Sequence, residues 1–462
     1  MGILAAMAVP HPPIILPEIG KGEESKIQDT IDSFRNVMQR TAALRPDTIV
    51  LTSPHSVMYA DYFHISPGEK AKGSFAQFRA PEVELEAEYD SEFVKELSDL
   101  CGKKGLSAGT LGERSAALDH GTMIPLRFLQ EHSMNCKLVR IGLSGLPAKE
   151  HYRLGQYIAQ TAEKLNRRVV FIASGDLSHK LKEDGPYGFV PEGPVFDRQV
   201  TKYLGEGDFM SLLSMDAELC EKASECGLRS FWIMAGALDR CGVESELLSY
   251  EGPFGVGYGV AWLLAAGRDE SRNIGEQYLR QQREVMEARK AKEDALVRLA
   301  RLSLETYVKT HRILEKLPEN LPKELKERAA GAFVSLKKDG QLRGCIGTIM
   351  PTRDSLAEEI VQNAVSACSR DPRFSPVEEE ELEDLVYSVD VLSEPERIFS
   401  TDDLDVKRYG VIVESNGRRG LLLPDLSGID TVEEQIAIAR KKGNIGPRDE
   451  IQLWRFEVVR HT

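Results

Sequence analysis

The sequence predicts an α/β fold, a three-layer α/β/α domain with a mixed or largely parallel sheet over residues 1–267, followed by a smaller α+β domain over residues 291–462. Two observations predict the first domain: short apolar runs alternate with longer segments, and the longer segments repeat apolar residues at three- and four-residue spacing. A third observation separates the second domain. Residues 268–290 are rich in Glu, Arg, Lys and Gln and predict a charged helical linker.

The elements of the first domain follow from these patterns. Apolar, partly β-branched runs predict strands at residues 3–9, 47–53, 136–144, 167–174 and 244–250. Helical periodicity occurs over residues 26–44 and 149–165. The run "GYGVAWLLAAG", residues 257–267, is apolar throughout and begins with glycines, and we expect it to close the domain as a helix. Strands alternating with helices in this way are typical of a sheet that is covered on both faces.

The second domain has a different pattern. "GAFVSLKKDGQLRGCIGTI", residues 331–349, alternates around Asp339-Gly340, which is a strong hairpin signal. Further strands are predicted at residues 384–393, 409–424 and 452–460, and helices at 353–368 and 431–443. This succession of a hairpin, further strands and helices predicts an α+β domain.

Composition excludes several classes of protein. There are 59 Lys and Arg against 73 Asp and Glu, a formal net charge of −14, which argues against a broad nucleic-acid-binding surface. The seven cysteines form no C-x-x-C pair, which suits a reducing compartment rather than a disulfide framework. No apolar run reaches the roughly 18 residues that span a bilayer, and the amino terminus lacks the basic region of a signal peptide. We expect a cytoplasmic protein with no membrane partner.

Histidines and one glutamate follow the predicted strands where each strand ends. His11 follows "MAVP", His55 follows "LTSP", His179 follows "FIASGDLS" with Asp176 nearby, and Glu251 ends "LLSYE". His120 lies in "ALDHGTMIPL", a loop that we expect to enter a helix. In open α/β sheets, functional side chains gather outside the carboxyl ends of the strands. One such histidine alone is more often structural, but this set could meet in a single crevice.

The residue types in this set suggest metal chemistry. Two imidazoles and one carboxylate on one face of an ion form the facial triad of non-heme Fe(II) oxygenases, which leaves positions open for a substrate and dioxygen. Histidines beside such an ion would exchange protons near neutral pH. Cys220 and Cys226 lie in a helical pattern with irregular spacing, and we assign them no metal role.

The blocks "VPHPPIILPEIG", "SPHS", "ALDHGTMIPL", "SGDLSHKL" and "SYEGPFGVGYG" resemble, in this order, the LigB-type (class III) extradiol dioxygenases and the related MEMO-like proteins. The resemblance implies ring-opening oxidation of a catechol-like diol by dioxygen. It implies Fe(II), with zinc, copper or manganese as other divalent candidates. It makes His11, His55 and Glu251 the metal ligands, His179 the active-site base and His120 the second active-site histidine. MEMO-like relatives usually carry a Cys instead of the carboxylate; we interpret the nearest cysteine, Cys241, as structural.

The second domain resembles the AMMECR family through "LRGCIGTIMP" and "ACSRDPRFSPVEEEEL". Together the halves resemble the fused proteins of the AmmeMemoRadiSam system, which implies a radical SAM partner protein. The chain lacks the C-x-x-x-C-x-x-C motif of that partner's iron–sulfur cluster. Cys345 could be a nucleophile with Arg343 lowering its pKa, although a buried small side chain is favoured. "SRDPRF" is favoured as an ion-paired turn.

Three alternatives remain open at this point. The metal site could perform different chemistry in a radical SAM-linked pathway, or the domain could be a non-catalytic binding or scaffold protein. Self-association into a homo-oligomer is also left open.

Overall fold

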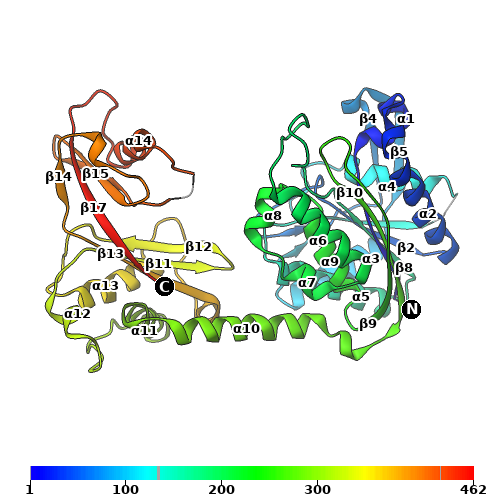
Figure 1. Ribbon diagram of the computed structural model, residues 1–462. Coiled ribbons are helices and arrows are strands. Elements are labelled where there is room, and N and C mark those ends of the chain that lie inside the picture. Colours follow the sequence, from blue (N-terminus) through cyan, green and yellow to red (C-terminus); the bar gives the residue numbers. More distant parts are fainter. Residues whose placement is uncertain (1, 133–135, 427) are drawn as a thin grey trace. The chain divides into compact units, whose positions relative to one another are not determined.

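The computed structural model describes residues 2–132, 136–426 and 428–462. The chain divides into two compact units, residues 1–282 and 283–462. The boundary falls within helix α10 (Ile274–Lys292), which covers residues 274–290 of the charged segment 268–290 that the sequence predicts as a linker. The first unit is a three-layer α/β/α structure and the second an α+β structure, which confirms the predicted fold classes (Figure 1).

The centre of the first unit is a six-stranded mixed sheet with the order β7-β2-β8-β1-β10-β9. Four neighbouring strands are parallel: β7 (Lys137–Gly142), β2 (Thr48–Ser53), β8 (Val169–Ser174) and β1 (Ile3–Val9). Strand β10 (Tyr258–Arg268) runs antiparallel to both β1 and the edge strand β9 (Cys241–Glu251). Strand β9 therefore points in the same direction as β1 but lies two positions away from it.

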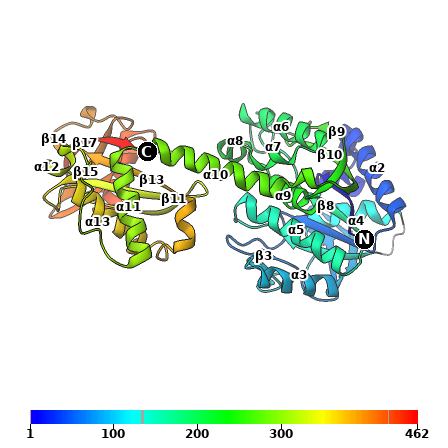
Figure 2. The same ribbon diagram turned by 90° about the horizontal axis from the view of Figure 1, so that it is seen from below.

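Helices cover both faces of this sheet. Successive residues of a strand face opposite ways, so alternate residues of each strand pack against different helices. On β1, Ala5 and Met7 pack with α2 (Gln28–Leu44) and α4 (His120–Gln130). Ala6 and Ala8 face the opposite layer, whose main helices are α3 (Ser91–Lys103), α5 (Ala148–Lys164), α6 (Glu192–Glu206) and α9 (Leu228–Ala237). Figure 2 shows α5 and α9 together on this side of the sheet.

Shorter elements complete the first unit. Short helices are α1 (Pro17–Gly20), α7 (Phe209–Leu213) and α8 (Ala217–Ala223). Two small strand pairs lie outside the main sheet: β3 (Phe63–His64) with β6 (Ala108–Gly109), and β4 (Lys70–Phe75) with β5 (Ala80–Glu88).

The prediction of a closing helix over residues 257–267 is wrong, because this segment is strand β10. Its residues pair with β1 on one side and β9 on the other, and its first six residues are buried. A strand buried on both faces reads as a continuous apolar run, which periodicity alone cannot distinguish from a buried helix.

The second unit contains an antiparallel sheet with the order β12-β11-β13-β17-β15-β16, and β14 (Glu396–Ile398) also pairs with β17. Two hairpins supply its edges: β11 (Ala332–Lys338) with β12 (Gln341–Gly347), and β15 (Tyr409–Ser415) with β16 (Arg418–Leu422). The predicted Asp339-Gly340 turn joins the first pair, with positive φ at both residues. The inner strands are β13 (Leu385–Leu392) and β17 (Gln452–His461).

Helices pack on this sheet through two apolar clusters. One cluster joins β11 and β13 to α11 (Ala295–Thr310) and α13 (Leu356–Ser369), beside the short α12 (Lys323–Glu327). The other joins β15 and β16 to α14 (Val432–Lys442). All seven cysteines of the chain are free thiols. Within the described residues, no helix combines the length and the apolar character needed to cross a membrane.

Candidate metal centre

The predicted histidines lie where the parallel strands of the first unit end. His11 follows β1, His55 follows β2, and His179 follows β8, the strand between those two. His120 is the first residue of α4, with Asp119 as its N-cap. The parallel strands share one carboxyl edge, so the sequence positions these side chains at the same end of the sheet.

Three of the four histidines are in direct contact. The Nε2 atoms of His11 and His55 are 3.0 Å apart. The ring of His120 lies 4.0 Å from that of His55 and 5.6 Å from that of His11, measured between ring centroids. His11 is buried, whereas His55 is exposed, so the cluster opens to solvent on the His55 side. The structure thus brings together His11, His55 and His120.

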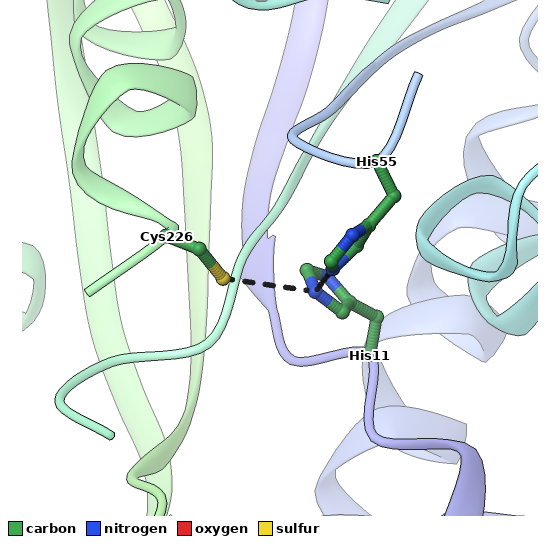
Figure 3. Close-up of side chains that lie close together, drawn as sticks. All are labelled: His11, His55 and Cys226. Carbon is green, nitrogen blue, oxygen red and sulfur yellow. Dashed lines mark hydrogen bonds between the residues drawn. The ribbon is translucent and has the colours of Figure 1, made fainter. Parts of the chain in front are cut away.

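Cys226, whose sequence pattern does not indicate a metal role, completes this cluster. Its Sγ lies 3.7 Å from His11 Nε2, and one ligand atom from each of His11, His55 and Cys226 falls within 4.8 Å of the others (Figure 3). Cys226 lies in the loop between α8 and α9. Among the described residues, this is the one group of three or more His, Cys, Asp or Glu side chains arranged to hold a metal ion.

A close approach of two glycines brings Cys226 to the sheet. A Cβ atom on Gly175, which directly follows β8, would lie 2.1 Å from the Cα of Gly227. The two backbones can come this close only because Gly175 has no side chain. The amide of Asp176 then donates to Cys226 Sγ at 3.3 Å, and the Asp176 carboxylate accepts the His11 amide at 2.8 Å. Asp176 thereby links the segments that carry two of the candidate ligands.

The prediction that Glu251 is the third ligand is not supported, because the structure places this carboxylate elsewhere. Glu251 Oε2 accepts hydrogen bonds from the amide and the hydroxyl of Thr30, at 2.7 and 2.6 Å. Thr30 lies in the first turn of α2, where amides have no partner within the helix and attract negative charge. Since β10 separates β9 from β1, Glu251 lies about 10 Å across the sheet from the end of β1. Cys226, and not Glu251, lies with the two histidines.

The hydrogen bonds around His11 fix which of its ring nitrogens carries the proton. The Ser174 hydroxyl donates its only proton to the Gly121 carbonyl at 2.6 Å. Its oxygen can therefore only accept from His11 Nδ1, 2.9 Å away. In the neutral ring, Nε2 then has a free lone pair directed at His55 and Cys226. Outer partners of this kind typically orient metal-binding histidines.

Electrostatics keeps the imidazoles neutral. Burial, together with the neighbouring His55, lowers the pKa of His11 to about 3. Burial and the adjacent His55 and His11 also lower the pKa of His120 to about 3. Burial lowers the pKa of His55 as well. Neutral imidazoles are the form that binds metal ions.

The three donors fit a transition-metal ion. Metal–nitrogen bonds of about 2.0–2.1 Å and metal–sulfur bonds of about 2.3 Å require donor atoms roughly 3–4 Å apart, and the observed separations from His11 Nε2 are 3.0 and 3.7 Å. Burial, with Asp176 and Glu225 nearby, raises the pKa of the Cys226 thiol well above its usual value. A bound cation reverses this effect, because a coordinating thiol loses its proton.

His179 stands beside the cluster as a candidate proton acceptor. Its ring stacks on Tyr187 with centroids 5.1 Å apart, and its Nε2 is buried without a hydrogen-bond partner. Burial lowers the pKa of His179, and the nearby carboxylate of Asp176 opposes this shift. Burial in turn raises the pKa of Asp176 to about 6. His179 is therefore a neutral base next to a group that stabilises its protonated form.

In the second unit, Cys345 and Arg343 bond to different partners. The Arg343 guanidinium is occupied by Glu381 and by the carbonyls of Ser375 and Pro376. Cys345 instead accepts the Ser335 hydroxyl at 3.1 Å through its sulfur. Asp371 and Arg373 form the favoured ion-paired turn, with Arg373 Nη2 2.7 Å from Asp371 Oδ2.

The fold and the site together describe an α/β/α domain with a possible metal-binding group of side chains at the carboxyl ends of its parallel strands. Residues 5–261 match the sequence model of the family described as the catalytic LigB subunit of aromatic ring-opening dioxygenase, and the chain belongs to this family. Residues 297–461 match the AMMECR1 family, so the predicted pairing of domains is confirmed. Membership supports an oxygenase-like enzyme in general.

Similar proteins include one spanning both domains. A protein of Clostridium acetobutylicum is 42% identical over 460 residues, which cover 98% of each chain. A protein of Thermotoga maritima is 51% identical over 160 residues, 34% of this chain and 91% of the relative. Among solved structures, an uncharacterised protein from Pyrococcus horikoshii has 35% identity and a TM-score of 0.34, covering 36% of this chain and 88% of its own.

Proposed function

We propose that the first unit is a metal-dependent enzyme of oxygenase type, which binds one transition-metal ion through His11, His55 and Cys226. The observation that supports it best is the convergence of these three donors within 4.8 Å of one another. His120 and His179 would serve as the neighbouring acid–base groups.

The donor set resembles the facial triad in number and charge. Two neutral imidazoles and one thiolate carry a single negative charge, as two imidazoles and one carboxylate do, and they leave further positions open. The thiolate is softer, which favours iron, copper or zinc over magnesium or calcium. A bound ion would supply Lewis acidity toward a substrate oxygen.

The protein's own groups would manage the proton. His179 is neutral and near Asp176, so it can accept a proton from a substrate hydroxyl, and the Asp176 charge then stabilises the imidazolium. His120 packs edge-on against Phe78, with ring centroids 5.1 Å apart, and remains neutral at ordinary pH. It can donate one hydrogen bond to an oxygen atom beside the histidine cluster.

The reaction that family membership favours is extradiol ring opening of a catechol-like diol by dioxygen, with Fe(II) as the metal. A diol offers two oxygens to open metal positions and one proton to His179. This reaction gives His179 a role as the proton acceptor.

The specific observation that favours a second candidate is Cys226. A cysteine in place of the carboxylate is the MEMO-like pattern, so the site could perform different chemistry on an oxygen-bearing substrate, in a pathway with a radical SAM partner protein. The two candidates share the metal centre and differ in their need for dioxygen.

One experiment distinguishes the two candidate functions. The protein is purified anaerobically, its metal content is measured, and catechols and dioxygen are then added in an oxygen electrode. We expect one metal ion per chain and oxygen uptake with at least one diol. His179→Ala should retain the metal and lose uptake, whereas His311→Ala, at an exposed position of the second unit, should retain both. Metal without uptake would favour the second candidate, and a wild-type protein that takes up no metal would refute both.

A further inference from the structure

The first turn of α4 is linked to both candidate histidine ligands by hydrogen bonds that pass through Ser53 and Ser174. Asp119 caps this helix: its Oδ1 accepts the Thr122 amide at 3.0 Å and its Oδ2 accepts the Thr122 hydroxyl at 2.9 Å. The same Oδ1 also accepts the Ser53 hydroxyl at 2.5 Å. Ser53 ends β2, so this bond ties the start of α4 to the strand that carries His55.

The connection continues from Ser53 to His55. Ser53 Oγ accepts the backbone amide of His55 at 3.2 Å. Because the Ser53 proton is given to Asp119, its oxygen is available to receive this amide. The Asp119 carboxylate thus fixes the turn that aims His55.

A second connection runs from Gly121 to His11. The Gly121 carbonyl would normally accept the amide of residue 125 within the helix, but residue 125 is Pro125, which has no amide proton. The freed carbonyl accepts the Ser174 hydroxyl, and Ser174 in turn accepts from His11 Nδ1. A proline inside a buried helix, otherwise unfavourable, therefore leaves an acceptor that sets the tautomer of His11.

Close packing at Gly121 holds these connections together. A Cβ atom here would lie 2.4 Å from Ser53 Oγ and 3.4 Å from His55 Cδ2. A contact of 2.4 Å is far inside van der Waals distance, so α4 can approach Ser53 only with glycine at this position.

We propose that the first turn of α4 positions the ligands of the metal centre. Asp119 orients His55 through Ser53. The Gly121 carbonyl, which Pro125 leaves without a partner in the helix, orients His11 through Ser174. This inference rests on the proposed function, because it takes His11 and His55 as ligands. It assigns Asp119, Ser174 and Pro125 a positioning role and no contact with substrate.

The test measures metal affinity and the absorption spectrum of the Co(II)-substituted full-length protein. Asp119→Ala and Ser174→Ala should each weaken metal binding by about 10- to 100-fold and shift the ligand-field bands, and Asp119→Asn should restore most of the affinity. Asp208→Ala is the matched control, since Asp208 caps α7 with the same pair of bonds, to the Ser211 amide and hydroxyl at 3.0 and 2.6 Å. It should retain wild-type affinity and spectrum.

Pro125→Ala separates positioning from helix stability. Alanine restores the amide and suits a helix interior better than proline, so thermal stability should be unchanged or higher, while metal affinity falls several-fold. Wild-type affinity and spectrum in Asp119→Ala and Ser174→Ala would overturn the inference and leave the metal centre standing. A wild-type protein that binds no Co(II) would instead refute the proposed function.

Discussion

The carboxyl ends of β1 and β9 make an instructive comparison. Both strands point the same way and both end in a side chain that can bind a metal, His11 after β1 and Glu251 on β9. Strand β1 lies next to β8 and near β2, so His11 meets His55, whereas β10 separates β9 from β1. Glu251 is instead bound by Thr30 on α2. A donor at a strand end thus joins the site only when its strand is close enough in the sheet and no local partner holds the side chain.

The largest expected effect contrasts Cys226 with Glu251. Cys226→Ala removes one of three donors and should weaken metal binding by about a hundredfold or more, since even outer partners of ligands contribute 10- to 100-fold. Glu251→Ala should leave the affinity within about threefold, because its carboxylate bonds Thr30. Competition titration against a chromophoric chelator measures both values. The opposite ranking would restore Glu251 as the ligand.

The glycine contact behind Cys226 gives the next largest effect. Gly175→Ala would place a Cβ 2.1 Å from the Gly227 Cα and push the Cys226 loop from the sheet, so metal affinity should fall by about 10- to 100-fold. Gly102→Ala is the control: Gly102 lies in α3 with nothing within 4 Å of the added atom, so stability should rise by up to about 1 kcal/mol. Equal affinities in the two variants would contradict this account of how Cys226 reaches the site.

Binding through Cys226 also predicts a pH dependence. The pKa of the thiol is raised well above its usual value by burial, while the pKa of His11 is lowered to about 3. Because burial also lowers the pKa of His55, metal binding near neutral pH should displace one proton, from the thiol, and affinity should strengthen by about tenfold per pH unit as the pH rises. Isothermal titration in buffers of different ionisation enthalpy counts the protons released. A pH-independent affinity would argue that the thiol is not a ligand.

Local sequence patterns predict some of the site residues, whereas strand order and the packing of distant segments decide the others. Strand-end positions of His11, His55 and His179, and the helix start at His120, follow from local patterns and are found where expected. The position of Glu251, away from the histidines, could not be predicted, because local sequence does not determine the order of strands in the sheet. Cys226 was missed because its position beside the histidines depends on the contact between Gly175 and Gly227, which lie in distant segments. The only sequence signal for this contact is the two glycines themselves, Gly175 in "SGD" and Gly227 directly after "EC". The helix predicted over residues 257–267 was wrong because a strand buried on both faces, such as β10, has no alternation of apolar and polar residues.

The smallest effect concerns stability at the β9 end. Glu251→Ala removes two hydrogen bonds to the first turn of α2 and should destabilise the first unit by about 1–2 kcal/mol. A double-mutant cycle with Thr30→Val should show a coupling of about 1 kcal/mol, measured on the calorimetric transition of the first unit. Additive effects would show that the pair contributes nothing to α2.

X-ray absorption spectroscopy of the metal-loaded protein shows directly whether Cys226 is a ligand, because it detects sulfur bound to the metal. We expect one sulfur at about 2.3 Å and nitrogen ligands at about 2.0–2.1 Å, and we expect the sulfur to be absent in Cys226→Ser. A metal bound at His11 and His55 with only nitrogen and oxygen neighbours in the wild-type protein would contradict this expectation.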